Sequence, residues 1–255
     1  MSVFVRKLHI IGKVITVFII AIIILMTVSG CGSANTADEK NLAEKNAAVN
    51  VISVVYEDNI PYVEIAAIFV KNDVPESIRQ KMQGVTIGKN SRVSFEDLSY
   101  LTVTHMGYDG VPHIGNIIVD KELADEVLLI FRELYEKEFP IERMELPCNY
   151  NGIDELSMQA NNTSSFNDRP VTGGTGLSYH QLGRAIDINP LVNPYVKTST
   201  NTILPQTAGK YTDRTLEEKG MIKKDSECVK IFKKYGWSWG GDWKSLKDYQ
   251  HFEKR

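Results

Sequence analysis

The N-terminal segment constrains the fold most, because its composition separates it from any globular domain. Three basic residues lie within the first thirteen positions, and residues 14–28 are almost wholly apolar and uncharged. Small residues follow at positions 29–32. A basic start, a short apolar stretch and a small-residue end are typical of a secretory signal. We therefore expect residues 1–31 to be a targeting segment and the rest of the chain to fold outside the cytoplasmic membrane.

Cys31 gives this signal a more specific form. The residues Val28-Ser29-Gly30-Cys31 resemble the box of bacterial lipoproteins, in which the cysteine is lipidated and becomes the new N-terminus. The chain is then expected to be a lipoprotein anchored to the cell membrane. Two alternatives stay open: an ordinary signal that leaves Cys31 as a free thiol, and an uncleaved N-terminal anchor helix. The apolar run of 15 residues is shorter than the roughly 20 that a spanning helix needs.

The remaining composition is that of an ordinary globular protein and argues against nucleic acid as a partner. The formal net charge is -3, and no run of Lys and Arg forms the basic patch that nucleic-acid binding requires. The three cysteines, Cys31, Cys148 and Cys228, form no C-x-x-C pair, so a cysteine-based zinc site is not expected. An oxidising compartment permits a disulfide between Cys148 and Cys228, and the sequence leaves its formation open.

Periodicity divides the rest of the chain into a tether and a folded part. Residues 32–81 are expected to form a flexible, polar tether and then apolar stretches of unknown role, either strands or a strand and a short helix. Apolar residues that recur at intervals of three and four predict an amphipathic helix over 121–138, ended by Pro140. Residues 149–170 should be loop with short elements, and 225–235 should form a short helix.

A polar segment over residues 178–190 concentrates side chains that an ordinary core avoids. Residues 185–189 alternate in polarity, which predicts a strand that projects Asp187 from a rigid element. Gly183 permits a bend that would bring His180 back beside Asp187. A rigid base suits a metal ligand, because ligands must be placed to within a fraction of an ångström.

A second polar segment near the C-terminus completes the candidate constellation. Asp248 and His251 are three residues apart, and on a helical turn they would share one face. His251 would then bind a metal together with His180 and Asp187, while Asp248 contacts a bound water. Two histidines and one carboxylate with an open fourth position form a catalytic zinc pattern.

Such spacings also occur by chance, so a single histidine carries little weight. His105 and His113 have no carboxylate at a matching spacing in a Gly-bend-strand context and are interpreted as loop or core-edge residues. Asp242 is a rival of Asp248, although its Gly-Gly-Asp-Trp context favours a turn. If the spacings are accidental, the alternative is a secreted globular domain without a metal.

The combined motifs resemble the M15 peptidases, a family that includes D-alanyl-D-alanine carboxypeptidases and L-alanyl-D-glutamate endopeptidases. The resemblance extends over about residues 82–255, and the C-terminal segment is most similar to the endopeptidase and phage-endolysin branch. It rests on Ser178-x-His180-x-x-Gly183-x-Ala185-x-Asp187, on Trp-Gly-Gly-Asp-Trp at 239–243, and on Asp248-x-x-His251-Phe252-Glu253.

This resemblance implies an α+β domain with a small antiparallel sheet, flanking helices and one zinc site. The family's catalytic carboxylate falls on Asp248, where the carboxypeptidase branch typically has Glu. Its arginine that stabilises the substrate or the oxyanion falls best on Arg169, and Ser178 would lie beside the site and bind substrate. The family's metal ligands fall on His180, Asp187 and His251.

The expected function is that of a zinc metallopeptidase that hydrolyses peptide bonds in bacterial peptidoglycan stem peptides. A D-alanyl-D-alanine or L,D-carboxypeptidase and an L-alanyl-D-glutamate endopeptidase both stay open, because pocket shape decides which bond is presented. The alternative of a different class is a zinc-containing cell-wall-binding module without turnover. Asp248 and Arg169 speak against that alternative, since a pure binder needs no general base.

Overall fold

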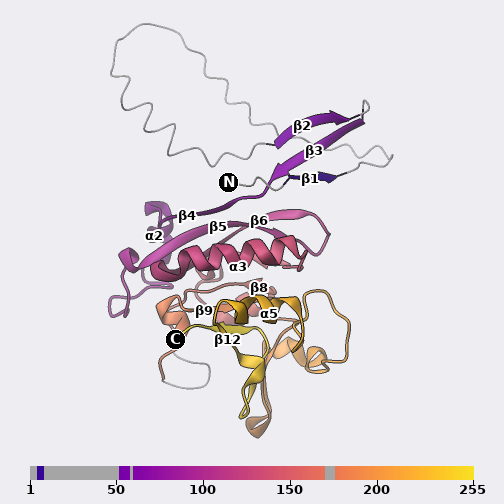
Figure 1. The fold of residues 1–255 in the computed structure, drawn as a ribbon. Helices are drawn as coiled ribbons and strands as arrows, with labels where there is room; N and C mark the ends of the chain where they lie inside the picture. The colour runs from indigo at the N-terminus through magenta and orange to yellow at the C-terminus, as the bar shows by residue number, and fades with distance from the viewer. Residues whose placement is uncertain (1–4, 9–51, 58–59, 170–175) are drawn as a thin grey trace, which may run out of the picture. The chain divides into compact units, whose positions relative to one another are not determined.

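The computed structural model describes residues 5–8, 52–57, 60–169 and 176–255, and it divides the chain into the units Met1–Ala67 and Ile68–Arg255. In the first unit, the strands β1 (Val5–Leu8), β2 (Ile52–Glu57) and β3 (Ile60–Ala66) pair antiparallel in the order β1-β3-β2 (Figure 1). The strand β1 lies in the basic start of the expected targeting segment. The apolar run and Cys31 lie outside the described residues. Within the part of the chain that is described, no helix combines the length and the apolar composition needed to cross a bilayer.

The second unit begins with an antiparallel sheet in the order β4-β5-β6, formed by β4 (Phe69–Asp73), β5 (Leu98–Met106) and β6 (Pro112–Asp120). Between β4 and β5 lie the helix α2 (Glu76–Met82) and the 3-10 turn η1 (Phe95–Asp97). The predicted amphipathic helix is confirmed as η2 (Lys121–Leu123) followed by α3 (Ala124–Glu136), which lies against this sheet (Figure 1). Its apolar face is buried because Val127, Ile130, Phe131 and Leu134 recur at helical spacing.

The same core continues into a second antiparallel sheet that carries the candidate site. This sheet has the order β12-β14-β9 and consists of β12 (Ser238–Trp239), β14 (His251–Glu253) and β9 (Ala185–Asp187). The predicted C-terminal helix is confirmed as α5 (Glu227–Lys234), whose Phe232 stacks on Phe252 of β14 with ring centroids 3.9 Å apart. Burying a side chain of this size contributes about 1.5–3 kcal/mol.

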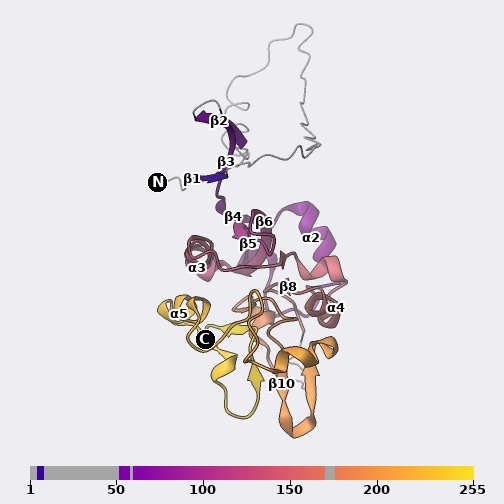
Figure 2. The same ribbon diagram turned by 90° about the vertical axis from the view of Figure 1, so that its right-hand side faces the viewer.

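A third sheet forms a wall beside the second one. It has the order β11-β10-β13 and consists of β11 (Thr202–Leu204), β10 (Tyr195–Lys197) and β13 (Lys247–Asp248), with η5 (Thr198–Thr200) linking β10 to β11. The β10–β11 hairpin projects from the body of the unit (Figure 2). Residues 149–170 contain only short elements, as predicted: the end of η3 (Pro147–Tyr150), then α4 (Asp154–Gln159) and β8 (Asn162–Thr163). The remaining short elements are β7 (Arg143–Met144), η4 (Tyr179–Leu182), η6 (Gln206–Thr212) and η7 (Gly240–Asp242).

The α+β class with small antiparallel sheets is confirmed, and three local expectations need correction. Asp248 and His251 do not share a helical turn; they lie in the separate strands β13 and β14. Of the loop and core-edge positions predicted for His105 and His113, the loop position is wrong, because they face each other in register on β5 and β6. The strand predicted over 185–189 ends at Asp187. Cys148 and Cys228 are free thiols. The predicted division of the chain at residue 82 stays a prediction.

Candidate metal centre

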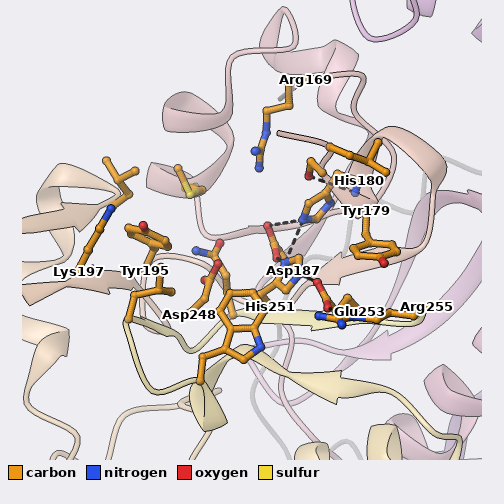
Figure 3. Close-up of a pocket in the computed structure, with 17 residues that line it drawn as sticks. Arg169, Tyr179, His180, Asp187, Tyr195, Lys197, Asp248, His251, Glu253 and Arg255 are labelled. Atoms are coloured by element: carbon orange, nitrogen blue, oxygen red, sulfur yellow. Dashed lines mark hydrogen bonds and ion pairs between the residues drawn. The ribbon is translucent and has the colours of Figure 1, made fainter. Parts of the chain in front are cut away.

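Three buried side chains from three different elements converge on one point. His180 comes from η4, Asp187 from β9 and His251 from β14, and their ligand atoms all lie within 4.8 Å of one another (Figure 3). Nε2 of His180 lies 3.2 Å from Nδ1 of His251 and 3.2 Å from Oδ2 of Asp187. Nδ1 of His251 lies 3.0 Å from Oδ1 of Asp187. The structure thus brings together the three side chains for which the sequence predicts a role as metal ligands.

The backbone around His180 explains how it reaches Asp187. Ser178 caps η4: its Oγ accepts from the His180 amide at 3.3 Å, and its own amide donates to Oε1 of Gln181 at 3.1 Å. Gly183 then turns the chain with φ 68°, a conformation that favours glycine. A Cβ at this position would stand 2.5 Å from the Asp120 amide nitrogen. The bend that the sequence predicted at Gly183 is therefore present, and no larger residue fits there.

Strand register fixes the other two ligands. Asp187 and His251 are direct partners in the antiparallel β9–β14 pair. Partners in such a pair project from the same face of the sheet. The neighbouring pair, Ile186 and Phe252, points to the opposite face and is fully buried. The ligands therefore face the site because their neighbours face the core.

Hydrogen bonds to the far side of each imidazole fix which nitrogen faces the centre. Nδ1 of His180 donates to the Ser165 carbonyl oxygen at 2.7 Å, which leaves Nε2 free of a proton and directed inward. Nε2 of His251 lies 3.3 Å from Oε2 of Glu253, which leaves Nδ1 directed inward. Outer partners of this kind are typical of metal-binding histidines. Two inward imidazole lone pairs and one carboxylate repel one another unless a positive charge lies between them. Two histidines and one carboxylate are also a donor set that fits zinc.

Burial and neighbouring charges act in opposite directions on the titratable groups of this centre. Burial opposes ionisation of Asp187, but the two imidazoles hold the pKa of its carboxyl well below its usual range. Burial also opposes protonation of His251, yet hydrogen bonds to Asp187 and Glu253 raise its pKa to about 10. A proton therefore occupies the site when no cation does, and a metal ion must displace it.

Asp248 lies beside this centre on β13. Burial, followed by the charge of Asp187, raises the pKa of Asp248 to about 6, although His251 opposes the shift. Within the described chain its Oδ1 is buried and has no hydrogen-bond partner. A carboxylate with a raised pKa and an unused oxygen at a pocket is suited to general acid–base work.

Arg169 extends into the pocket from the side opposite Asp248 and His251 (Figure 3). It forms an ion pair with Asp154 at the start of α4. Burial lowers the pKa of Arg169, but Asp154, Asp187 and Asp248 outweigh that effect and raise it. Arg169 is thus a charged donor, held in place by Asp154, that faces His180, Asp187 and His251 across the pocket.

These groups line a pocket of about 400 Å³. Its polar floor contains the three ligands, Asp248 and Glu253, and the indole of Trp243 packs against His251 with ring centroids 5.3 Å apart. Ser178 also lines the pocket, as predicted, although its Oγ serves as a helix cap. The apolar part of the lining comes from Met158, Leu177, Leu204 and Leu246.

The other candidate residues, Asp242, His105 and His113, do not line this pocket. Asp242 forms an ion pair with Lys233 at 2.6 Å and does not line the pocket, so it is no rival of Asp248. His105 is buried, and burial lowers its pKa to about 4; its ring stacks on His113 at 5.8 Å. His113 in turn pairs with Asp109 at 2.9 Å.

The residues that hold the site's side chains in place were not predicted from the sequence. Asp154, Ser165 and Glu253 hold Arg169, His180 and His251 respectively. Only Glu253 had a usable signal: in a strand, residues two apart share a face, so a strand containing His251 places Glu253 beside it. The contacts of Asp154 and Ser165 are long-range and have no local pattern.

Residues 172–254 match a family model described as D-alanyl-D-alanine carboxypeptidase, one of the M15 peptidases. The match includes the three converging ligands and Asp248, whereas Arg169 lies just before it. The searches of curated proteins and of solved structures each gave no match. The match to residues 172–254, which include His180, Asp187 and His251, supports a relationship of this part of the chain to the M15 peptidases.

Proposed function

We propose that the chain is a zinc-dependent peptidase that hydrolyses peptide bonds in bacterial peptidoglycan stem peptides. One observation carries the proposal: two imidazole nitrogens lie 3.2 Å apart, both within hydrogen-bond distance of Asp187, at the floor of a pocket that also holds Asp248. A single proton binds to the lone pair of only one of those nitrogens, whereas a metal cation can bind to the lone pairs of both. The family match supports a peptidase of the D-alanyl-D-alanine carboxypeptidase type.

Each polar group around the pocket has a place in this chemistry. His180, Asp187 and His251 would hold zinc, which when bound polarises a carbonyl and lowers the pKa of water to about 7. Asp248 accepts the proton of the attacking water and returns it to the leaving amine. Arg169 donates hydrogen bonds to the oxyanion from the opposite side. The Ser178 hydroxyl accepts from the His180 amide and still has its own proton to donate to substrate.

The proposed location is extracytoplasmic, with the chain anchored to the membrane through a lipid on Cys31. The basic start, the short apolar run and the small residues before Cys31 support this location. We expect Cys31→Ser to release the protein from the membrane fraction of producing cells. If the variant stays in that fraction, an uncleaved anchor replaces the lipid in this proposal.

The activity is tested by incubating the zinc-loaded protein with purified muropeptides, with and without a chelator, and measuring product masses. Chelator-sensitive cleavage is expected, and the masses identify the bond. Asp248→Asn should keep its zinc and lose turnover, whereas Asp225→Asn, an exposed control, should keep both. Stoichiometric zinc without any cleavage would refute the peptidase and favour the wall-binding module.

A further inference from the structure

One face of the β11-β10-β13 sheet forms a wall of the pocket. Tyr195 of β10 is the direct partner of both Leu204 and Asp248, so these three side chains form a row across one face. Lys197, two residues along β10, starts the next row on the same face. All four residues line the pocket, and Figure 3 shows Tyr195 and Lys197 together on the side away from Arg255.

Three cations line this pocket, and they differ in how they are neutralised. Arg169 pairs with Asp154, and Arg255 pairs with Glu253 at 3.1 Å. Lys197 is half-buried, and among the residues that the structure describes it has no carboxylate partner. A half-buried ammonium group gains most from an anion that arrives with a ligand.

Resting on the proposed function, we propose that Lys197 binds the α-carboxylate of the residue on the leaving side of the scissile bond. Asp248 returns its proton to the leaving amine, so the leaving residue must lie on the side of the pocket where Asp248 stands. The sheet runs from Asp248 through Tyr195 to Lys197. Strand spacing and rise place the Cα atoms of Asp248 and Lys197 about 8 Å apart, within the span of a lysine side chain and one residue.

The three bonds that the function leaves open present the same chemistry at this position. In D-alanyl-D-alanine, and in the L,D bond of a stem tetrapeptide, the leaving alanine carries the free C-terminal carboxylate. In L-alanyl-D-glutamate the leaving glutamate, linked onward through its γ-carboxyl, carries a free α-carboxylate. Lys197 therefore selects an α-carboxylate next to the leaving nitrogen, and the apolar row of Tyr195 and Leu204 sets the surroundings of that residue.

The test removes the charge of Lys197 in the enzyme and, separately, the charge of the carboxylate in the substrate, and then combines the two changes. The peptides are the stem pentapeptide L-Ala-γ-D-Glu-L-Lys-D-Ala-D-Ala, its C-terminal carboxamide and its D-isoglutamine form. Lys197→Gln should lower kcat/KM for the parent peptide about 10- to 100-fold, mainly through KM, as expected for loss of a charge-assisted hydrogen bond. It should cause no further loss on the peptide whose relevant carboxylate is already an amide. If the wild type releases free D-alanine, the C-terminal carboxamide is the peptide that tests Lys197. If it releases free L-alanine, the D-isoglutamine form is the peptide that tests Lys197.

Two further variants isolate the charge. Lys197→Arg should recover most of the lost kcat/KM, and Lys224→Gln, at an exposed position, should leave it unchanged. Thermal unfolding and zinc content should be the same for all four proteins. An equal loss on the carboxylate and carboxamide peptides, or no loss at all, overturns the role of Lys197 while the peptidase stands. Failure of the zinc-loaded wild type to cleave any of these peptides or the stem tetrapeptide L-Ala-γ-D-Glu-L-Lys-D-Ala overturns the peptidase, and this inference with it.

Discussion

Glu253 offers the sharpest test of how the metal ligands are held. Its carboxylate lies 3.3 Å from Nε2 of His251, on the far side of the ring from the centre, and Glu253 itself is buried. Because His251 and Glu253 share one face of β14, the carboxylate fixes both the rotation of the ring and the proton on Nε2. Glu253→Gln keeps the size of the side chain and removes its charge.

The structure supports a loss of about 10- to 100-fold in zinc affinity for this variant, the range for outer partners of metal ligands. That range corresponds to about 1.4–2.7 kcal/mol. Glu253→Asp should be at least as damaging, because one methylene less withdraws the carboxylate from Nε2. Arg255 forms an ion pair with the other oxygen of Glu253, but its side chain is 76% exposed. Arg255→Gln should therefore change the zinc affinity by less than about fivefold, since exposed pairs contribute at most about 1 kcal/mol.

Competition with a chromophoric chelator measures the zinc dissociation constant directly and does not depend on turnover. Substitution with cobalt gives a second readout, because the absorption spectrum of the ion reports the geometry of its ligands. Glu136→Gln, at an exposed position on α3, is the matched control and should leave both readouts unchanged. If Glu253→Gln binds zinc as tightly as the wild type, the orientation of His251 does not depend on Glu253 and the reasoning is wrong.

Three other outcomes are expected. Asp248→Asn should lower kcat by at least about 100-fold and abolish the fall of kcat/KM at acidic pH. In the wild type the midpoint of that fall should lie near pH 6, or lower because a bound cation favours the ionised base. Stopped assays over pH 4.5–8 measure both effects. Zinc affinity should fall about tenfold for each unit that the pH decreases from 9 to 7. The reason is that the pKa of His251 without a metal is raised to about 10, so the ion must displace a proton. A zinc affinity that does not change with pH over this range contradicts the raised pKa. Gly183→Ala should lower the free energy of unfolding by several kcal/mol, because φ is 68° and the new Cβ meets backbone atoms, whereas Gly209→Ala, with open space around it, should be nearly neutral in urea denaturation.

The features that the sequence predicted well are those encoded locally. The helix α3 follows from apolar residues at intervals of three and four, and the bend before β9 follows from Gly183 ahead of an alternating strand. The combined motifs singled out His180, Asp187 and His251, which the structure brings together, and their role as metal ligands stays a prediction. Each motif needs only a short stretch of chain, so a pattern of residues is enough to predict it.

The expectations that failed depended on partners far away in the chain. Asp248 and His251 have a spacing that suits a helical turn, but β13 pairs with β10 and β14 pairs with β9, so each residue joins a different sheet. The role proposed for Lys197 likewise depends on the register between Tyr195 and Asp248, which are 53 positions apart in the sequence. His105 has a polar sequence context, yet its pairing with His113 on β6 places it in a buried strand. Periodicity contains no information about which strands pair.

Pairing also links the stability of the domain to its chemistry. In the β9–β14 pair, Ile186 opposite Phe252 belongs to the core, and Asp187 opposite His251 belongs to the proposed metal site. A shift of register by one residue would turn Asp187 or His251 into the core and expose an apolar partner, which costs several kcal/mol in lost burial and in buried charge. The stacking of Phe252 on Phe232 of α5 opposes that shift. The apolar residues between the ligands therefore set the geometry of the metal site, and a cavity made at Phe252 should weaken zinc binding even though Phe252 does not line the pocket.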